Sequence, residues 1–93
     1  MSKEVQKMIM DECIDIANVL IDKNRKYGDS VLNPVRLFSK ASTIEQINVR
    51  LDDKMSRIVR GDRNGDHEDP EFDIIGYLVL KRIHKKLHME GGE

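Results

Sequence analysis

Apolar side chains recur at helical spacing along the first quarter of the chain, in the order Val5, Ile9, Ile16, Val19 and Leu20. Positions three, four and seven apart share one face of a helix, so this spacing predicts a helix from about Ser2 to Lys26. Basic residues near its end and a glycine just after it are typical of a helix C-terminus: Lys23, Arg25, Lys26 and Gly28.

A second long helix is predicted from Thr43 to Arg60. The segment Ser42-Thr-Ile-Glu45 has the pattern of a capping box, in which the serine and the glutamate cap the first turn. Gly61 is placed to end this helix. Its apolar face is formed by Ile44, Ile47, Leu51, Met55 and Ile58.

Two Asx-Pro pairs mark further helix starts, because Asn or Asp caps a helix well and proline is tolerated at its first position. Asn33-Pro34 predicts a short helix to about Lys40, and Asp69-Pro70 predicts a long last helix to about His88. The first half of the last helix is apolar nearly all round, which predicts burial on several sides. Gly76 within it permits the close approach of another helix.

No segment has the pattern of a strand, so the sequence predicts an all-α fold of three long helices and one short helix. The length of 93 residues favours a single domain spanning residues 1–93. So short a chain buries a modest fraction of its surface, and partner subunits would complete its core. The broad apolar surface of Asp73 to Leu80 argues against a monomer.

Composition excludes several classes of function. The net charge of −1 provides no overall field for nucleic acid or an anionic membrane, so we expect neither direct nucleic-acid binding nor membrane association. No apolar run approaches the roughly 18 residues needed to span a bilayer, and no signal peptide is evident. The single cysteine, Cys13, suits a reducing compartment, which predicts a cytoplasmic protein.

Several polar residues fall on or beside the predicted apolar faces. Asp73 has the strongest case for a site, because it stands at the start of the most apolar stretch of the chain. Glu12, Lys23 and Tyr27 lie on the stripe of the first helix. On the later helices the residues bordering the apolar faces are Glu45, Asn48, Asp52, Asp69, Tyr77 and His84.

Clustered carboxylates repel one another unless a cation lies between them, and Mg²⁺ prefers such oxygen ligands. We therefore expect a shared cation site that draws on Glu45, Asp52, Asp69 and Asp73. Structural roles compete with this interpretation: Asp69 as a helix cap, Glu45 as a capping-box partner, Glu12 in an internal ion pair. A weaker alternative is a Ca²⁺ loop over residues 62–73, which lacks the glycine that an EF-hand requires.

Four segments in this order resemble the small phage and bacterial proteins called nucleotide-modification-associated or MazG-like. They are Lys23-Asn-Arg-Lys-Tyr-Gly-Asp-Ser30, Asn33-Pro34, Val49-Arg-Leu-Asp-Asp-Lys-Met-Ser-Arg-Ile58 and Asp73-Ile-Ile-Gly-Tyr77. The resemblance covers about Ile9 to Ile83. It departs from the usual MazG acid pattern, because Glu45-Gln-Ile-Asn48 ends in an amide and Pro70 stands between Asp69 and Asp73 where an acid is usual.

The resemblance implies a helical nucleoside triphosphate pyrophosphohydrolase that forms homodimers or homotetramers. Such an enzyme uses Mg²⁺, with Mn²⁺ as a substitute, to cleave a nucleotide to its monophosphate and pyrophosphate. Asp73 and Asp53 are the candidate catalytic residues, and whether Asp52 or Asp53 binds the metal stays open. Candidates for substrate contacts are Lys23, Lys26, Tyr27, Lys54 and Arg57. The alternative is a non-catalytic helical module that binds nucleotide or assembles with a partner.

Overall fold

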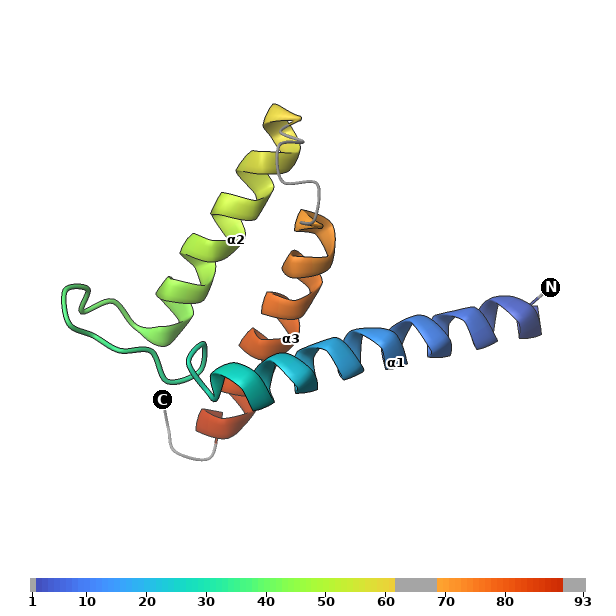
Figure 1. Cartoon of the computed structure of the whole chain (residues 1–93), viewed down its shortest axis with the longest axis horizontal. Helices are drawn as coiled ribbons and strands as arrows, with labels where there is room; N and C mark the ends of the chain where they lie inside the picture. Colours follow the sequence, from blue (N-terminus) through green and yellow to red (C-terminus); the bar gives the residue numbers. More distant parts are fainter. Residues whose placement is uncertain (1, 62–68, 90–93) are drawn as a thin grey trace.

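The computed structural model of this chain describes residues 2–61 and 69–89. The described part holds three helices and no strand: α1 (Ser2–Tyr27), α2 (Thr43–Arg60) and α3 (Pro70–Met89). The all-α prediction is therefore confirmed for these residues, and each long helix ends within one residue of its predicted bounds. As Figure 1 shows, α2 and α3 lie side by side, while α1 crosses α3 near its own C-terminal end.

The capping signals explain why the helices start and stop where they do. The Ser42 hydroxyl accepts a hydrogen bond from the Glu45 N–H at 3.1 Å, as a capping-box serine does. The Asp69 carboxylate accepts one from the Phe72 N–H at 3.0 Å and so caps α3. Gly61 ends α2 in the left-handed conformation with φ 65°, and Gly28 follows α1 with φ 66°. These local contacts fix both ends of α2 and the start of α3.

The predicted short helix from Pro34 to Lys40 is wrong. Residues 34–41 form no helix, and the loop is held instead by the guanidinium of Arg36. This group donates to the Ala41 carbonyl at 3.2 Å and to the Thr43 hydroxyl at 2.8 Å. The apolar side chains of the loop have nothing to pack against, and Phe38 is 98% exposed. A helix of about two turns without tertiary contacts is unstable, so the capping signal alone does not produce a helix.

The core of one chain lies between α2 and α3 and is small. Ile47 of α2 is 1% exposed and is the only fully buried large side chain among the described residues. Lys81 of α3 donates to the side-chain oxygen of Asn48 at 2.7 Å across the same interface. Together with the Lys54–Asp73 ion pair at 3.1 Å, this contact shows that the two helices run antiparallel.

Helix α1 joins this pair at one point of close approach. A Cβ atom placed on Gly76 of α3 would lie 3.0 Å from the Leu20 side chain, so glycine permits this approach as predicted. No residue of α1 is buried. Its N-terminal half extends away from α2 and α3 (Figure 1). None of the described helices is long and apolar enough to cross a membrane.

Candidate functional site

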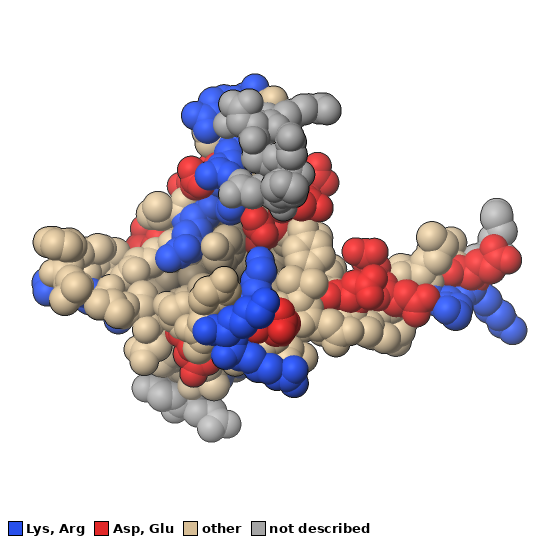
Figure 2. All heavy atoms as spheres, in the orientation of Figure 1, with Lys and Arg blue, Asp and Glu red and all other residues tan. Residues whose placement is uncertain are grey.

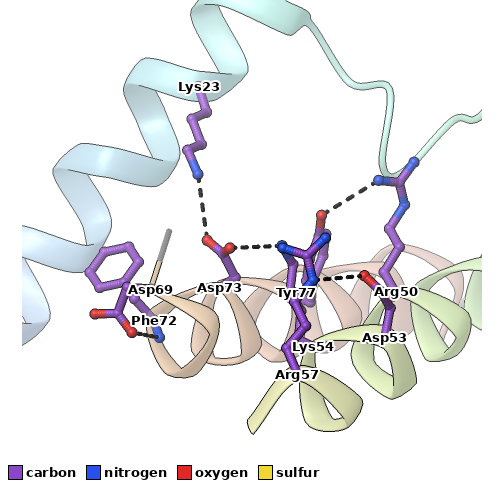
Figure 3. Close-up of polar contacts among 9 residues, drawn as sticks. All are labelled: Lys23, Arg50, Asp53, Lys54, Arg57, Asp69, Phe72, Asp73 and Tyr77. Carbon is purple, nitrogen blue, oxygen red and sulfur yellow. Dashed lines mark hydrogen bonds and ion pairs between the residues drawn. The ribbon is translucent and has the colours of Figure 1, made fainter. Parts of the chain in front are cut away.

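The carboxylate of Asp73 lies where the three helices meet. Its Oδ2 is 3.1 Å from the Lys54 ammonium of α2, and its Oδ1 is 3.8 Å from the Lys23 ammonium of α1. The Asp73 side chain is 22% exposed and that of Lys54 is 14% exposed, whereas Lys23 is 55% exposed. Asp73 is therefore charge-paired and partly shielded from water, with the stronger contact toward α2 (Figure 3).

A cavity of about 380 Å³ opens beside Asp73. Its walls come from the C-terminal end of α1, the turn at 28–32, and the facing sides of α2 and α3. Apolar side chains form one part of the wall: Leu20, Phe72 and Leu80. Polar and aromatic groups form the other part: Lys23, Asn24, Tyr27, Arg50, Asp73 and Tyr77. The cavity thus combines an apolar wall with two cationic side chains, Lys23 and Arg50, and two carboxylates, Asp29 and Asp73. An apolar lining with a few placed polar groups is typical of small-ligand sites.

Arg50 and Tyr77 approach each other across this cavity. The Arg50 guanidinium donates a long hydrogen bond of 3.5 Å to the Tyr77 hydroxyl, and its carbon lies 5.9 Å from the centre of the ring. Figure 3 shows Tyr77 following Asp73 along α3, with Arg50 of α2 reaching toward its hydroxyl. Asp73 and Tyr77 stand four residues apart on α3, and both side chains border the cavity.

The other predicted carboxylates lie elsewhere. Asp53 is exposed and forms an ion pair with Arg57 one turn later on α2, at 3.6 Å. Asp52 and Glu45 are also exposed on α2, and Glu45 occupies the capping-box position of the first turn. Asp69 caps α3 through its side chain, which is the structural alternative to metal binding. Glu12 is exposed on α1 and does not point into a core of this chain.

The separate positions of these carboxylates are relevant to the expected Mg²⁺ site, which requires several of them to lie together. Across residues 2–61 and 69–89, no three side chains of His, Cys, Asp or Glu gather closely enough to hold a metal ion. Of the predicted metal ligands, Asp73 is the one that lines the cavity. Its negative charge is already paired with the ammonium groups of Lys23 and Lys54. The donor set of the described residues therefore does not fit a divalent cation. The Ca²⁺ loop considered above falls on residues 62–68, which lie outside the described part.

The predicted cationic contacts divide into two groups. Lys23 and Tyr27 line the cavity, and Lys54 reaches Asp73 at its edge. Arg57 is engaged by Asp53, and Lys26 forms an ion pair with Asp22 at 3.3 Å on α1. His84, which sequence placed at the border of the apolar face, is buried at 5% exposure, with its ring 4.2 Å from that of His88. It does not line the cavity.

Four polar cavity residues were not predicted from the sequence as part of a site: Asn24, Asp29, Ser30 and Arg50. Arg50 stands four residues before Lys54, so the helical period places both on the same side of α2. That signal was available, since Lys54 was already a candidate. Asn24 was not predictable in this way, because its amide is held by Asp29 at 2.8 Å and the Gly28 carbonyl at 3.2 Å within the turn after α1.

No protein-family model, curated protein or solved structure matches this chain.

Proposed function

We propose that this chain binds a nucleoside triphosphate in the cavity beside Asp73. The cavity carries this proposal, because it offers cations for a phosphate chain next to rings and aliphatic groups for a base or sugar. Lys23 and Arg50 line it directly, and the Arg50 guanidinium can contact phosphate oxygens through two N–H groups at once. Its volume of about 380 Å³ falls within the range of roughly 300–1,000 Å³ that is usual for small-ligand sites.

The resemblance to MazG-like proteins extends this proposal to a reaction. We propose that the bound nucleotide is hydrolysed to its monophosphate and pyrophosphate in the cytoplasm, by a homodimer or homotetramer. The exposed free thiol of Cys13 suits that reducing compartment. The acids among the described residues do not gather closely enough to hold Mg²⁺ or Mn²⁺.

A panel of deoxynucleoside and ribonucleoside triphosphates tests both parts. Binding would be measured by calorimetry with Mg²⁺ and, separately, with EDTA, and pyrophosphate release would be measured on the same samples. We expect one base or sugar to be preferred and to release pyrophosphate. Arg50→Met should weaken binding, whereas Lys85→Met, which removes an exposed lysine of α3 outside the cavity, should not. Absence of binding by any nucleotide to the folded protein would overturn the proposal.

A specific observation favours a second candidate, a nucleotide-binding module without catalysis. Asp73 is the acid with the strongest sequence case, yet its carboxylate is paired with Lys54 and Lys23. In this arrangement it balances the charge of two groups that a phosphate chain would contact. Tight nucleotide binding without pyrophosphate release, in the presence or absence of Mg²⁺, would support the module and reject the enzyme.

A further inference from the structure

One face of α1 carries acids in its first part and bases in its last part. Glu12, Asp15, Val19, Lys23 and Lys26 follow one another at steps of three or four residues. At 3.6 residues per turn they fall within an arc of roughly 80°, so they form a single strip along the helix. We call this strip the pairing face.

Among the described residues the pairing face is mostly uncovered, although Lys23 forms an ion pair with Asp73 of α3 and Lys26 with Asp22 of α1 itself. No residue of α1 is buried, although the helix has 26 residues. Apolar side chains next to the strip are open to solvent, with Met8 at 68% and Ile9 at 58% exposure. Helical stability in proteins comes mainly from tertiary packing of an apolar face, so a helix of this length requires a surface to cover it.

A shallow hollow lies on the same side of α1. It has a volume of about 370 Å³ and is lined by Asn18, Val19, Asp22, Lys23, Lys26 and Tyr27. Three of its lining residues belong to the pairing face, and two of those are lysines. The hollow therefore places the ammonium groups of Lys23 and Lys26 beside the aliphatic side chain of Val19. This arrangement fits an acidic segment of a helix.

We infer that the pairing face binds the same face of a second copy of this chain, with the two α1 helices antiparallel. If Val19 meets Val19 at the two-fold axis, Asp15 lies opposite Lys23, and Glu12 lies opposite Lys26, because the members of each pair stand equally far from Val19. A parallel arrangement would instead bring like charges together. Figure 2 shows acidic side chains along the part of α1 that extends away from the other helices.

The distribution of charge along α1 favours a second copy of this chain as the partner of the pairing face. Residues 2–15 contain two lysines and four carboxylates, a net charge of −2, while residues 16–27 contain three cations and one carboxylate, a net charge of +2. With Val19 at the two-fold axis, residues 11–15, which carry three carboxylates, lie opposite residues 23–27, which carry three cations. One antiparallel register therefore matches both segments, as a two-fold interface requires. This inference rests on the assembly part of the proposed function. Lys23 belongs both to the pairing face and to the nucleotide cavity, so the test below uses Glu12 and Lys26, which do not line that cavity.

A charge-reversal cycle tests the inference on the full chain, with the mass measured by light scattering across a range of concentrations. We expect a mass of at least twice 10.8 kDa. Glu12→Lys and Lys26→Glu should each raise the dimer dissociation constant roughly tenfold, because each contact occurs twice in a two-fold dimer. The double variant should restore association. Residues 12 and 26 stand roughly 21 Å apart along the helix, so they cannot compensate each other within one chain.

Lys85→Glu makes the same charge change on an exposed position of α3 and should leave the dissociation constant unchanged. Spin labels fix the orientation without altering the pairing face, using Gln6→Cys in a Cys13→Ser background. The antiparallel dimer predicts about 39 Å between the labelled positions, since each stands 13 residues from Val19, whereas parallel helices predict roughly 10 Å. A monomer at all concentrations overturns both the inference and the proposed assembly. A dimer that keeps its affinity in both single variants, or that gives the short distance, overturns the inference alone.

Discussion

Asp73 of α3 and Lys54 of α2 form an ion pair across the interface of their helices, with 3.1 Å between the carboxylate oxygen and the ammonium nitrogen. Both side chains are largely shielded, so water screens this pair less than it screens a surface pair. The pair lies at the edge of the cavity where α1 supplies Lys23. One contact therefore connects the packing of two helices with the charge of the candidate site.

The two lysines that reach Asp73 should differ in their contribution to stability. Lys54→Met is expected to lower the free energy of unfolding by about 1–2 kcal/mol, because it leaves a partly buried carboxylate with a single distant cation. Lys23→Met should lower it by less than about 0.5 kcal/mol, since that pair is longer and more exposed. Urea unfolding of the two variants at one fixed protein concentration gives the comparison. Equal losses of unfolding free energy in the two variants would show that Lys54 does not stabilise the Asp73 carboxylate more than Lys23 does.

Removing the charge of Asp73 should separate nucleotide binding from hydrolysis. In Asp73→Asn the ammonium groups of Lys54 and Lys23 lose their counter-charge, which favours an incoming phosphate chain. We expect nucleotide binding in EDTA to tighten several-fold while pyrophosphate release is lost. Calorimetry and a pyrophosphate assay on the same samples provide the readout. Weaker binding in EDTA would contradict the proposed contact between the lysines and the phosphate chain.

Arg50 should contribute to binding through its charge and Tyr77 through its ring. Arg50→Met is expected to weaken nucleotide binding roughly tenfold, the scale of one lost hydrogen bond to a charged group. Tyr77→Phe keeps the ring and loses only the 3.5 Å hydrogen bond, so its effect should be below about threefold. Binding constants for the two variants, measured under the same salt concentration, check this order. A larger loss in Tyr77→Phe would show that the hydroxyl contacts the ligand directly.

Gly61 ends α2 in a left-handed backbone conformation, and replacing it tests how much this C-cap contributes to stability. With φ at 65°, an alanine there is expected to cost about 1 kcal/mol of stability, because its Cβ disfavours the left-handed region. Asparagine tolerates this conformation better, so Gly61→Asn should cost clearly less. Thermal unfolding followed by circular dichroism compares the two variants. Among the described residues, the chain neighbours of Gly61 apart, no heavy atom lies within 4 Å of an added Cβ.

The sequence predicted the helices well because their signals are local. Ser42 and Asp69 form the capping contacts that their spacing indicated, and apolar periodicity located the long helices. The same local reasoning failed for Pro34 to Lys40, where a start signal was present but no apolar surface was available to pack against. A capping residue lowers the cost of starting a helix without supplying the tertiary contacts that a short helix needs.

The candidate site was less predictable, because it depends on how α1 meets the other helices. Sequence identified Asp73 as exceptional and Lys23, Lys54 and Tyr27 as candidates, and these four meet at or beside the cavity. The expected neighbours of Asp73 were carboxylates, whereas its neighbours in space are ammonium groups. A helical wheel places residues around one axis and does not give the crossing point of two helices. Glu12 shares the stripe of Lys23, yet it stands about three turns away along α1.

That crossing point is set by Gly76 and Leu20, and a paired substitution tests it. Gly76→Leu should push α1 away from α3, since even a Cβ would lie 3.0 Å from the Leu20 side chain, and lower the free energy of unfolding by about 1–3 kcal/mol. Leu20→Ala alone should cost a similar amount through lost packing. The double variant is expected to recover part of the loss, because the new leucine fills the space left by the old one. Additive losses in urea unfolding would show that the two residues do not share a contact. Nucleotide binding should follow the same order, because Leu20 and Gly76 both line the cavity beside Asp73.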